Sequence, residues 1–157
     1  MIGRRRRGQR SERGAAALEF ALVMPFLLLL VFGIISYGMM LSLRQSMSQA
    51  ATEGARAAAV TLNASQKQTE GYASVNDALN SFGVSCASGT LRRGGASVGT
   101  CAVSSPGACT PAAGAGIQCV TVSLVYNYRD HPLVPSFPGL GVVLPETLSY
   151  SAQARVS

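Results

Sequence analysis

The sequence lacks most of the residue patterns that build catalytic or metal sites. It has one histidine, His131, and none of its four cysteines is separated from the next by only two residues, which disfavours a zinc site. It has no phosphate-binding loop and no pair of carboxylates placed for acid–base catalysis. We therefore expect no catalytic residue, no metal and no cofactor.

One sequence pattern resembles the nucleophile motif of a hydrolase. Residues 95–99 read Gly-Ala-Ser-Val-Gly, and Asp130 and His131 follow in the chain order of that enzyme class. The nucleophile of such an enzyme sits between a strand and a helix, whereas Gly94 precedes this segment and a Thr/Cys/Val segment follows it. Adjacent Asp130 and His131 also point apart in most backbone conformations, so we interpret 130–132 as a turn and expect no enzyme.

Charge is nearly absent between Ala15 and Leu43, where Glu19 is the one charged residue. About 20 apolar residues are enough to cross a bilayer core as a helix, and this run reaches about 43 Å at about 1.5 Å per residue. A removed secretory signal has a much shorter apolar stretch, and the same length argues against a twin-arginine signal. The run predicts a transmembrane helix over residues 15–43.

Arginine is concentrated before this run. Because short arginine-rich flanks stay in the cytoplasm, the excess over the single Arg44 that follows predicts a cytoplasmic amino terminus and an extracytoplasmic body. Removing residues 1–14 would take away six of the 13 basic residues but one of the 7 acidic ones, so nearly all of the net charge of +6 belongs to this leader. The rest carries no basic patch interleaved with aromatics, and Arg92-Arg93 beside Gly94-Gly95 is interpreted as a solvated loop, so we expect no nucleic-acid partner.

Glu19 does not fit a plain membrane anchor. An acid within an apolar helix costs about 2.5–3.5 kcal/mol at the helix centre, and less near the interface, so such residues usually have a partner. A buried charge is tolerated chiefly when an opposite charge and hydrogen bonds meet it. Glu19 is therefore a candidate functional residue.

Residues 14–20, Gly-Ala-Ala-Ala-Leu-Glu-Phe, resemble the site cut by type IV prepilin peptidases. Together with the apolar residues up to 30, they resemble the TadE-like pseudopilins of the tight-adherence (Tad, or Flp) type IV pilus system. The resemblance implies cleavage between Gly14 and Ala15, with Phe20 completing the processing motif, and a free amine on Ala15 that pairs with Glu19 of another subunit. The family often carries a second acid near the end of the run, where this chain has Ser36.

This resemblance also implies a function and partners. It predicts a minor pilin or pseudopilin that supports pilus biogenesis, adherence and biofilm formation. The expected partners are a prepilin peptidase, other Tad pilins and the inner-membrane assembly platform. The competing interpretation is a single-pass membrane-anchored binding domain that is never cut. Either protein would lie in the inner membrane with its carboxyl-terminal domain outside, and the pilin would also be a candidate filament component.

Two further features of the long helix bear on assembly. Pro25 removes one helical hydrogen bond, and we expect a bend near 21–25, either as useful flexibility or as a tolerated kink. Small residues also recur at every fourth position, which allows close approach of another element. We expect the chain's own sheet against residues 50–58, and either the chain or a partner helix against 38–46. The row consists of Gly38, Ser42, Ser46, Ala50, Gly54 and Ala58.

The helix is expected to continue beyond the membrane as an amphipathic extension over residues 44–62, because apolar side chains there keep helical spacing. Residues 63–157 then leave room for one small α+β domain of about 95 residues. Within it, 63–72 reads as a loop, and Ser74 reads as the N-cap of a short helix that stops at Gly83. We expect the complete fold to be α+β and pilin-like.

Two strands are predicted near the carboxyl terminus. Residues 117–128 and 147–156 alternate apolar and polar side chains, which predicts an antiparallel pair covered on its apolar face by the long helix. Residues 84–116 are rich in Gly, Ser, Ala and Thr and allow one weak strand near 98–103. The proline-rich loop 129–146 is expected to pack its apolar residues on the domain, with contact to a partner or the membrane as the alternative. These residues are Leu133, Val134, Phe137, Leu140, Val142, Val143 and Leu144.

The four cysteines indicate an oxidising compartment. They are even in number, absent from the apolar run and confined to the predicted outer domain, which favours two disulfides. Three connectivities are open. Pairing Cys86 with Cys101 and Cys109 with Cys119 is favoured because each bond closes a short loop without crossing the other.

Overall fold

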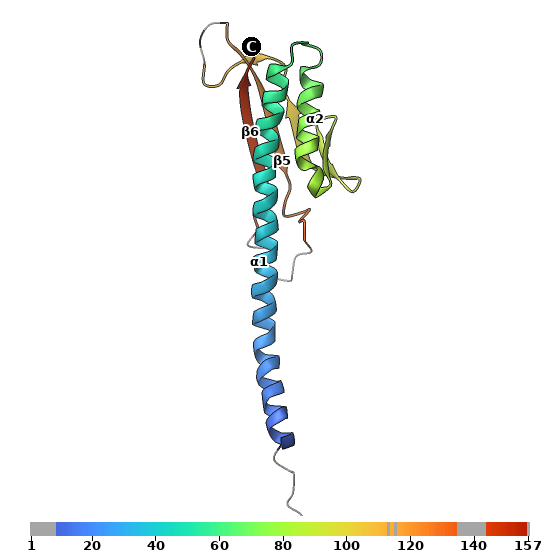
Figure 1. Cartoon of the computed structure of the whole chain (residues 1–157), viewed down its shortest axis with the longest axis vertical. Coiled ribbons are helices and arrows are strands. Elements are labelled where there is room, and N and C mark those ends of the chain that lie inside the picture. The colour runs from blue at the N-terminus through green and yellow to red at the C-terminus, as the bar shows by residue number, and fades with distance from the viewer. Residues whose placement is uncertain (1–8, 113, 115, 135–143, 157) are drawn as a thin grey trace, which may run out of the picture.

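The computed structural model describes residues 9–112, 114, 116–134 and 144–156, with side chains described from Gly14 onward. A long helix, α1 (Gln9–Val60), projects from a small domain made of a second helix and an antiparallel sheet (Figure 1). This confirms the predicted α+β layout. The helix ends at Val60, slightly before the predicted end of the amphipathic extension at 62.

Within the described residues, the sheet has six antiparallel strands. They are β1 (Val84–Ala87), β2 (Thr90–Arg93), β3 (Ala96–Val103), β4 (Gly107–Ala108), β5 (Gln118–Tyr126) and β6 (Leu148–Arg155). The order is β1-β2-β3-β5-β4, and β6 pairs with β5 over its whole length, from Cys119 opposite Arg155 to Tyr126 opposite Leu148. The antiparallel pair predicted from residues 117–128 and 147–156 is therefore confirmed, although β5 ends at Tyr126.

Two helices cover one face of this sheet. The outer half of α1 packs on β5 and β6, while α2 (Lys67–Leu79) packs on α1, β1 and β3 (Figure 1). The alternation read from the sequence matches the burial, since Val120, Val122 and Leu124 are almost fully buried and the residues between them are not. The largest fully buried side chains are Tyr126, Tyr128, Leu43, Met47, Leu79, Leu91, Leu124, Val75, Val98, Val120 and Val122.

The second helix differs from its prediction at its start. It begins at Lys67, so part of the expected loop 63–72 is helical and Ser74 lies inside the helix rather than at its N-cap. The Lys67 side chain is buried and donates hydrogen bonds to the carbonyls of Ala59, at 3.2 Å, and Thr61. These carbonyls lie at the end of α1, where backbone acceptors have no partner within the helix. Lys67 thus ties the start of α2 to the end of α1.

The other end of this helical segment lies where the sequence predicted it. A short 3₁₀ turn, η1 (Asn80–Phe82), follows α2, and Gly83 ends it with φ 64°. This left-handed conformation is readily adopted by glycine, and the Gly83 amide donates to the Asn80 carbonyl at 2.9 Å. The predicted stop at Gly83 is thus at the observed position.

The region 84–116 contains more sheet than predicted. Only a weak strand near 98–103 was expected, whereas β1, β2, β3 and β4 all form here. Arg92 and Arg93 belong to β2 rather than to a solvated loop, and the half-buried Arg93 donates to the Pro132 carbonyl at 3.2 Å. Strands of four residues and two have too few alternating positions to be recognised from sequence, since pairing with neighbours stabilises them.

Candidate membrane and assembly segment

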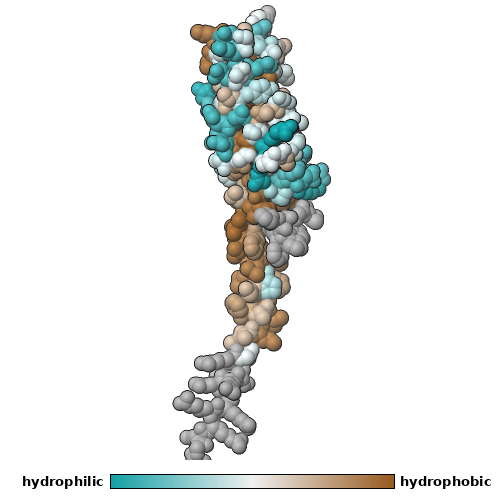
Figure 2. All heavy atoms as spheres, turned by 90° about the vertical axis from the view of Figure 1, so that its right-hand side faces the viewer, coloured by the Kyte–Doolittle hydropathy of each residue, from teal (hydrophilic) through white to brown (hydrophobic). Residues whose placement is uncertain are grey.

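The lower part of α1 is an exposed apolar rod. Its described portion, Gly14–Val60, is the one described helix that is long and apolar enough to cross a membrane by length and composition, and no residue of its most apolar stretch is buried. Phe20 is 61% exposed, Phe26 74% and Ile34 66%. Figure 2 shows the resulting hydrophobic surface below the more polar domain. A continuous apolar surface of this size marks a membrane or protein contact.

The predicted processing residues lie on this rod. Gly14, Ala15, Glu19 and Phe20 all belong to α1 and are exposed. Space around Gly14 is open, with no atom within 4 Å of the position that a side chain would occupy. Ala15 and Glu19 are four residues apart and so lie on the same face, one turn apart. Among the residues that the structure describes, Glu19 has no hydrogen bond or ion pair, so its carboxylate is available to another molecule.

Pro25 lies within α1 and does not interrupt it. Its nitrogen carries no hydrogen, so the carbonyl of Ala21 loses its usual helical donor. The bend expected near 21–25 stays a prediction, as does the role of Pro25 in assembly.

The row of small residues divides into two parts. In the upper part, Ala50 and Ala58 are fully buried, and a side chain on Gly54 would lie 2.7 Å from Val75 Cγ2 and 3.1 Å from the Gly71 carbonyl oxygen. The close neighbour is therefore chiefly α2, with β5 further away, and not the sheet alone as predicted. The lower part differs, because Gly38 has nothing within 4 Å of its missing side chain.

The lower end of the domain is fixed to α1 by polar contacts. Arg44, the first charged residue after the apolar run, donates a hydrogen bond to the Tyr150 hydroxyl, and its guanidinium carbon lies 6.0 Å from the centre of the Tyr150 ring. This contact joins α1 to β6. The sequence indicated Arg44 only as a topology signal, since nothing in it relates residue 44 to residue 150.

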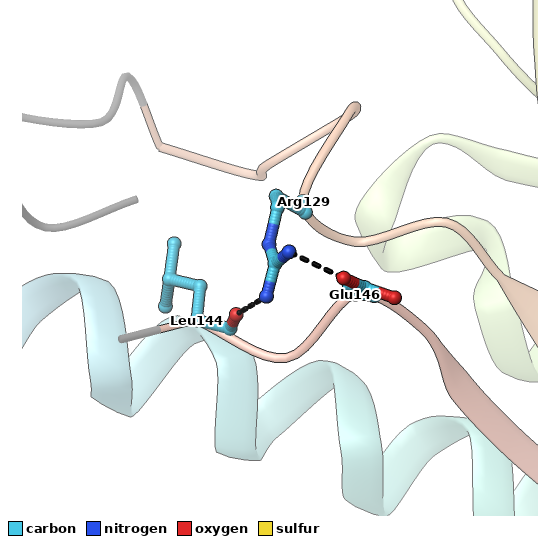
Figure 3. Close-up of polar contacts among 3 residues, drawn as sticks. All are labelled: Arg129, Leu144 and Glu146. Carbon is cyan, nitrogen blue, oxygen red and sulfur yellow. Dashed lines mark hydrogen bonds and ion pairs between the residues drawn. The ribbon is translucent and has the colours of Figure 1, made fainter. Parts of the chain in front are cut away.

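The two ends of the loop 129–146 are held together by Arg129. Arg129 donates to a Glu146 carboxylate oxygen at 2.6 Å and to the Leu144 carbonyl at 3.0 Å (Figure 3). Its backbone amide donates to the Glu146 carbonyl at 3.2 Å. Leu144 is buried and Leu133 is half-buried against the core, as the prediction of packing on the domain requires. Val134 is also half-buried, and the remaining four apolar residues of that prediction, Phe137, Leu140, Val142 and Val143, lie outside the described residues.

The hydrolase-like pattern does not assemble a catalytic site. A hollow of about 480 Å³ is lined by Ala96, Val98, Asp130 and His131 among others, but Ser97 is not part of its wall. Ser97 pairs with Arg92 at the edge of a hairpin. Gly99, the last residue of the pattern, has a packing role, because a side chain there would lie 1.9 Å from the Val125 carbonyl oxygen of the neighbouring strand.

Two disulfides are present, and their pairing is the one that closes two short loops. Cys86 is bonded to Cys101 and Cys109 to Cys119. The Asn76 side chain holds Cys86 as well, accepting from its amide at 2.5 Å and donating to its carbonyl at 3.3 Å. Sequence analysis gave no reason to single out Asn76, which fastens β1 to α2. Within the described portion of the chain, no group of three metal-ligating side chains comes together.

The described chain thus consists of an apolar helix that is exposed at one end, where it is a candidate membrane span, and packs against the sheet of a small α+β domain at the other. Residues 14–56 match the model of the TadE-like protein family. The resemblance inferred from the first part of the apolar run is therefore confirmed for this segment. The match covers the apolar run and the first part of its extension, and it shows a likeness to this family for that segment alone. Neither curated proteins nor solved structures gave a match.

Proposed function

We propose that this chain is a minor pilin or pseudopilin of the Tad (Flp) pilus. Residues 1–14 form a basic leader, 15–43 the membrane span, 44–62 its amphipathic extension and 63–157 the extracytoplasmic domain. The amino terminus lies in the cytoplasm and the domain in the periplasm or outside the cell. The observation that carries this proposal is the placement of Glu19. It is an acid without a partner in the described chain, one turn from Ala15 on an exposed apolar helix.

Processing by a prepilin peptidase would create the partner that Glu19 lacks. Cleavage after Gly14 releases the Ala15 amine, which is positively charged at neutral pH because its pKa is ordinarily about 8. This amine on one subunit pairs with Glu19 on a neighbour, and the apolar rods pack side by side. The two charges then meet in an environment that would penalise either of them alone. Prepilin peptidase supplies the chemistry, and Gly14, Ala15, Glu19 and Phe20 are substrate features.

The outer domain would cap the filament, prime its assembly or present a surface on it, in contact with other Tad pilins and the inner-membrane platform. Through these contacts it would support pilus biogenesis, adherence and biofilm formation. The lower small residues, of which Gly38 is fully open, give a neighbouring helix room for close approach.

Intact mass spectrometry of the protein purified from membranes that contain the peptidase tests this proposal. We expect a mature chain that begins at Ala15. Gly14→Ala should leave the chain uncut, because a side chain is added at the scissile bond. Gly38→Ala is the matched control: it adds the same methyl group at another open position of α1 and should be cut normally. An intact amino terminus in the wild-type protein would instead support an uncleaved membrane-anchored binding domain.

A further inference from the structure

The position at which the domain first covers α1 is sharply defined. Ile34 is 66% exposed and Ile35 47%, whereas Ser36 is 7% exposed, Met40 5% and Leu43 fully buried. Below Ser36 most described side chains of α1 are exposed, and above it one face of the helix belongs to the core. Among the described residues, Ser36 is therefore the first along α1 that is buried against the domain.

This limit coincides with the expected end of the membrane hydrocarbon. A bilayer core is about 30 Å thick, which a helix crosses in about 20 residues. A helix that enters the core at Ala15 leaves it near Ile35. The headgroup layer adds about 5–8 Å on each side, which corresponds to about four or five further helical residues. The layer thus extends along α1 from Ser36 to about Met40, shortly before the apolar run ends at Leu43, so little room remains between the lipid and the described part of the domain.

The lowest described part of the domain is apolar and firmly held. After β5 the chain descends beside α1 below the sheet (Figure 1). Tyr126 donates to the His131 carbonyl at 2.9 Å, and Arg93 donates to the carbonyls of Pro132 at 3.2 Å and Leu133 at 3.5 Å. The last described residues of this descending segment, Leu133 and Val134, are apolar and half-buried.

We propose that this surface, the domain base, rests on the lipid headgroups of the outward-facing leaflet. The domain base consists of Tyr37, Leu133 and Val134. Tyr37 is 56% exposed next to the first buried residue of α1, and aromatic side chains with a polar tip favour this depth in a membrane. The domain lies directly on the bilayer before assembly, and the contact rests on the proposed membrane insertion of α1.

Tryptophan fluorescence can measure this depth because the chain contains no tryptophan. Single variants of the full chain would be placed in phosphatidylcholine vesicles with acyl chains brominated near either the headgroup or the tail end. Val134→Trp and Tyr37→Trp report the domain base. Leu28→Trp is the control for membrane insertion, and Leu62→Trp, at a site 94% exposed beyond the far end of α1, is the control for water. Resistance of both disulfides to reduction by an added thiol verifies that each variant is folded.

The proposal expects the fluorescence of Val134→Trp and Tyr37→Trp to fall about twofold with bromine near the headgroup, as for side chains seated in the interface, and less with bromine near the tail end. Leu28→Trp should show the reverse order, and Leu62→Trp no quenching. If Leu28→Trp is quenched but neither base variant is, the domain stands clear of the lipid and the proposal is wrong. If Leu28→Trp is not quenched, membrane insertion itself is wrong. If Val134→Trp does not fold, the result for Tyr37→Trp is decisive. The proposal is overturned if Tyr37→Trp is quenched more strongly by bromine near the tail end than by bromine near the headgroup, or if it is not quenched at all.

Discussion

At the scale of single residues, Glu19 and Lys67 show two ways to place a charge in an apolar setting. Lys67 is buried and has its partners within the chain, the carbonyls of Ala59 and Thr61 at the end of α1. Glu19 is exposed on the rod and has none among the described residues. The first charge stabilises the fold, whereas we propose that the second pairs with another subunit.

Glu19→Ala should spare membrane insertion and damage pilus assembly. Removing the acid makes the helix more apolar, so insertion does not suffer. The partner's amine then enters an apolar environment without a counter-charge, which typically costs about 3–5 kcal/mol in buried pairs. Membrane fractionation and the amount of sheared surface pili measure the two effects. Leu22→Ala, a truncation on the same exposed rod, is the control, and normal piliation with Glu19→Ala would contradict the pairing.

Tyr126 makes the stability of the domain depend on alkaline pH. Burial raises its pKa above 10.0, although the nearby Arg93 acts in the opposite direction. Since the folded state holds this proton more tightly than the unfolded state, the stabilisation is complete below about pH 10 and is lost as pH rises through the folded pKa. Burial also raises the pKa of Tyr128, which adds to the same trend.

We therefore expect the free energy of unfolding to decline above about pH 10. Urea unfolding of the full chain in detergent at several pH values measures it. Tyr126→Phe should lower stability at neutral pH, because the hydrogen bond to the His131 carbonyl is lost, and should make the alkaline decline less steep. An equal slope in both proteins would show that other groups cause the decline.

At the scale of elements, the crossing of α1 and α2 depends on two glycines. A side chain on Gly54 would press on Val75 and the Gly71 carbonyl, and one on Gly71 would lie 2.9 Å from Val103 Cγ1. Both residues look unfavourable for a helix when read locally, since glycine costs about 0.5–1 kcal/mol relative to alanine there. Their value lies in the close contact that they permit.

Gly54→Ala should lower the free energy of unfolding by about 1–3 kcal/mol, the usual range for overpacking. Gly38→Ala adds the same methyl group to the same helix in open space and should be neutral or slightly stabilising. Thermal unfolding in detergent, followed by circular dichroism, compares the two. Equal midpoints would mean that the α1–α2 crossing adjusts to the methyl group without cost.

The two disulfides should also contribute to stability. Cys86 and Cys101 are separated by 15 residues, and closing a loop of that size restricts the unfolded chain by about 3 kcal/mol. Replacing both cysteines with alanine should lower the unfolding midpoint of the domain. The Cys109–Cys119 bond, which spans 10 residues, should contribute slightly less when it is removed in the same way. A double variant with an unchanged midpoint would contradict this expectation.

The features predicted correctly from the sequence are those with long, regular patterns. The apolar run, the alternation in β5 and β6 and the glycine at position 83 each carry a local physical signal. The start of α2 was missed because Gly71 and the surrounding polar residues read as loop, although Gly54 and Lys67 stabilise that helix through contacts with α1. Strand β1 was missed because Asn76 and the disulfide to β3 hold it at Cys86, and strand β2 was missed because it is held by pairing with β1 and β3, and none of these contacts is visible in a linear pattern.

At the scale of the whole molecule, α1 is one uninterrupted helix from the exposed rod to the far end of the domain. Tension applied at the lower end would therefore pass along the backbone hydrogen bonds of a single helix. It would reach the domain as shear along the sides of α1 that face α2 and β6, so many contacts would have to fail together. Arg44 and Tyr150 would meet this force near the lower end of the domain, because they join α1 to β6 there. A subunit built in this way could transmit a mechanical pull without unfolding at a hinge.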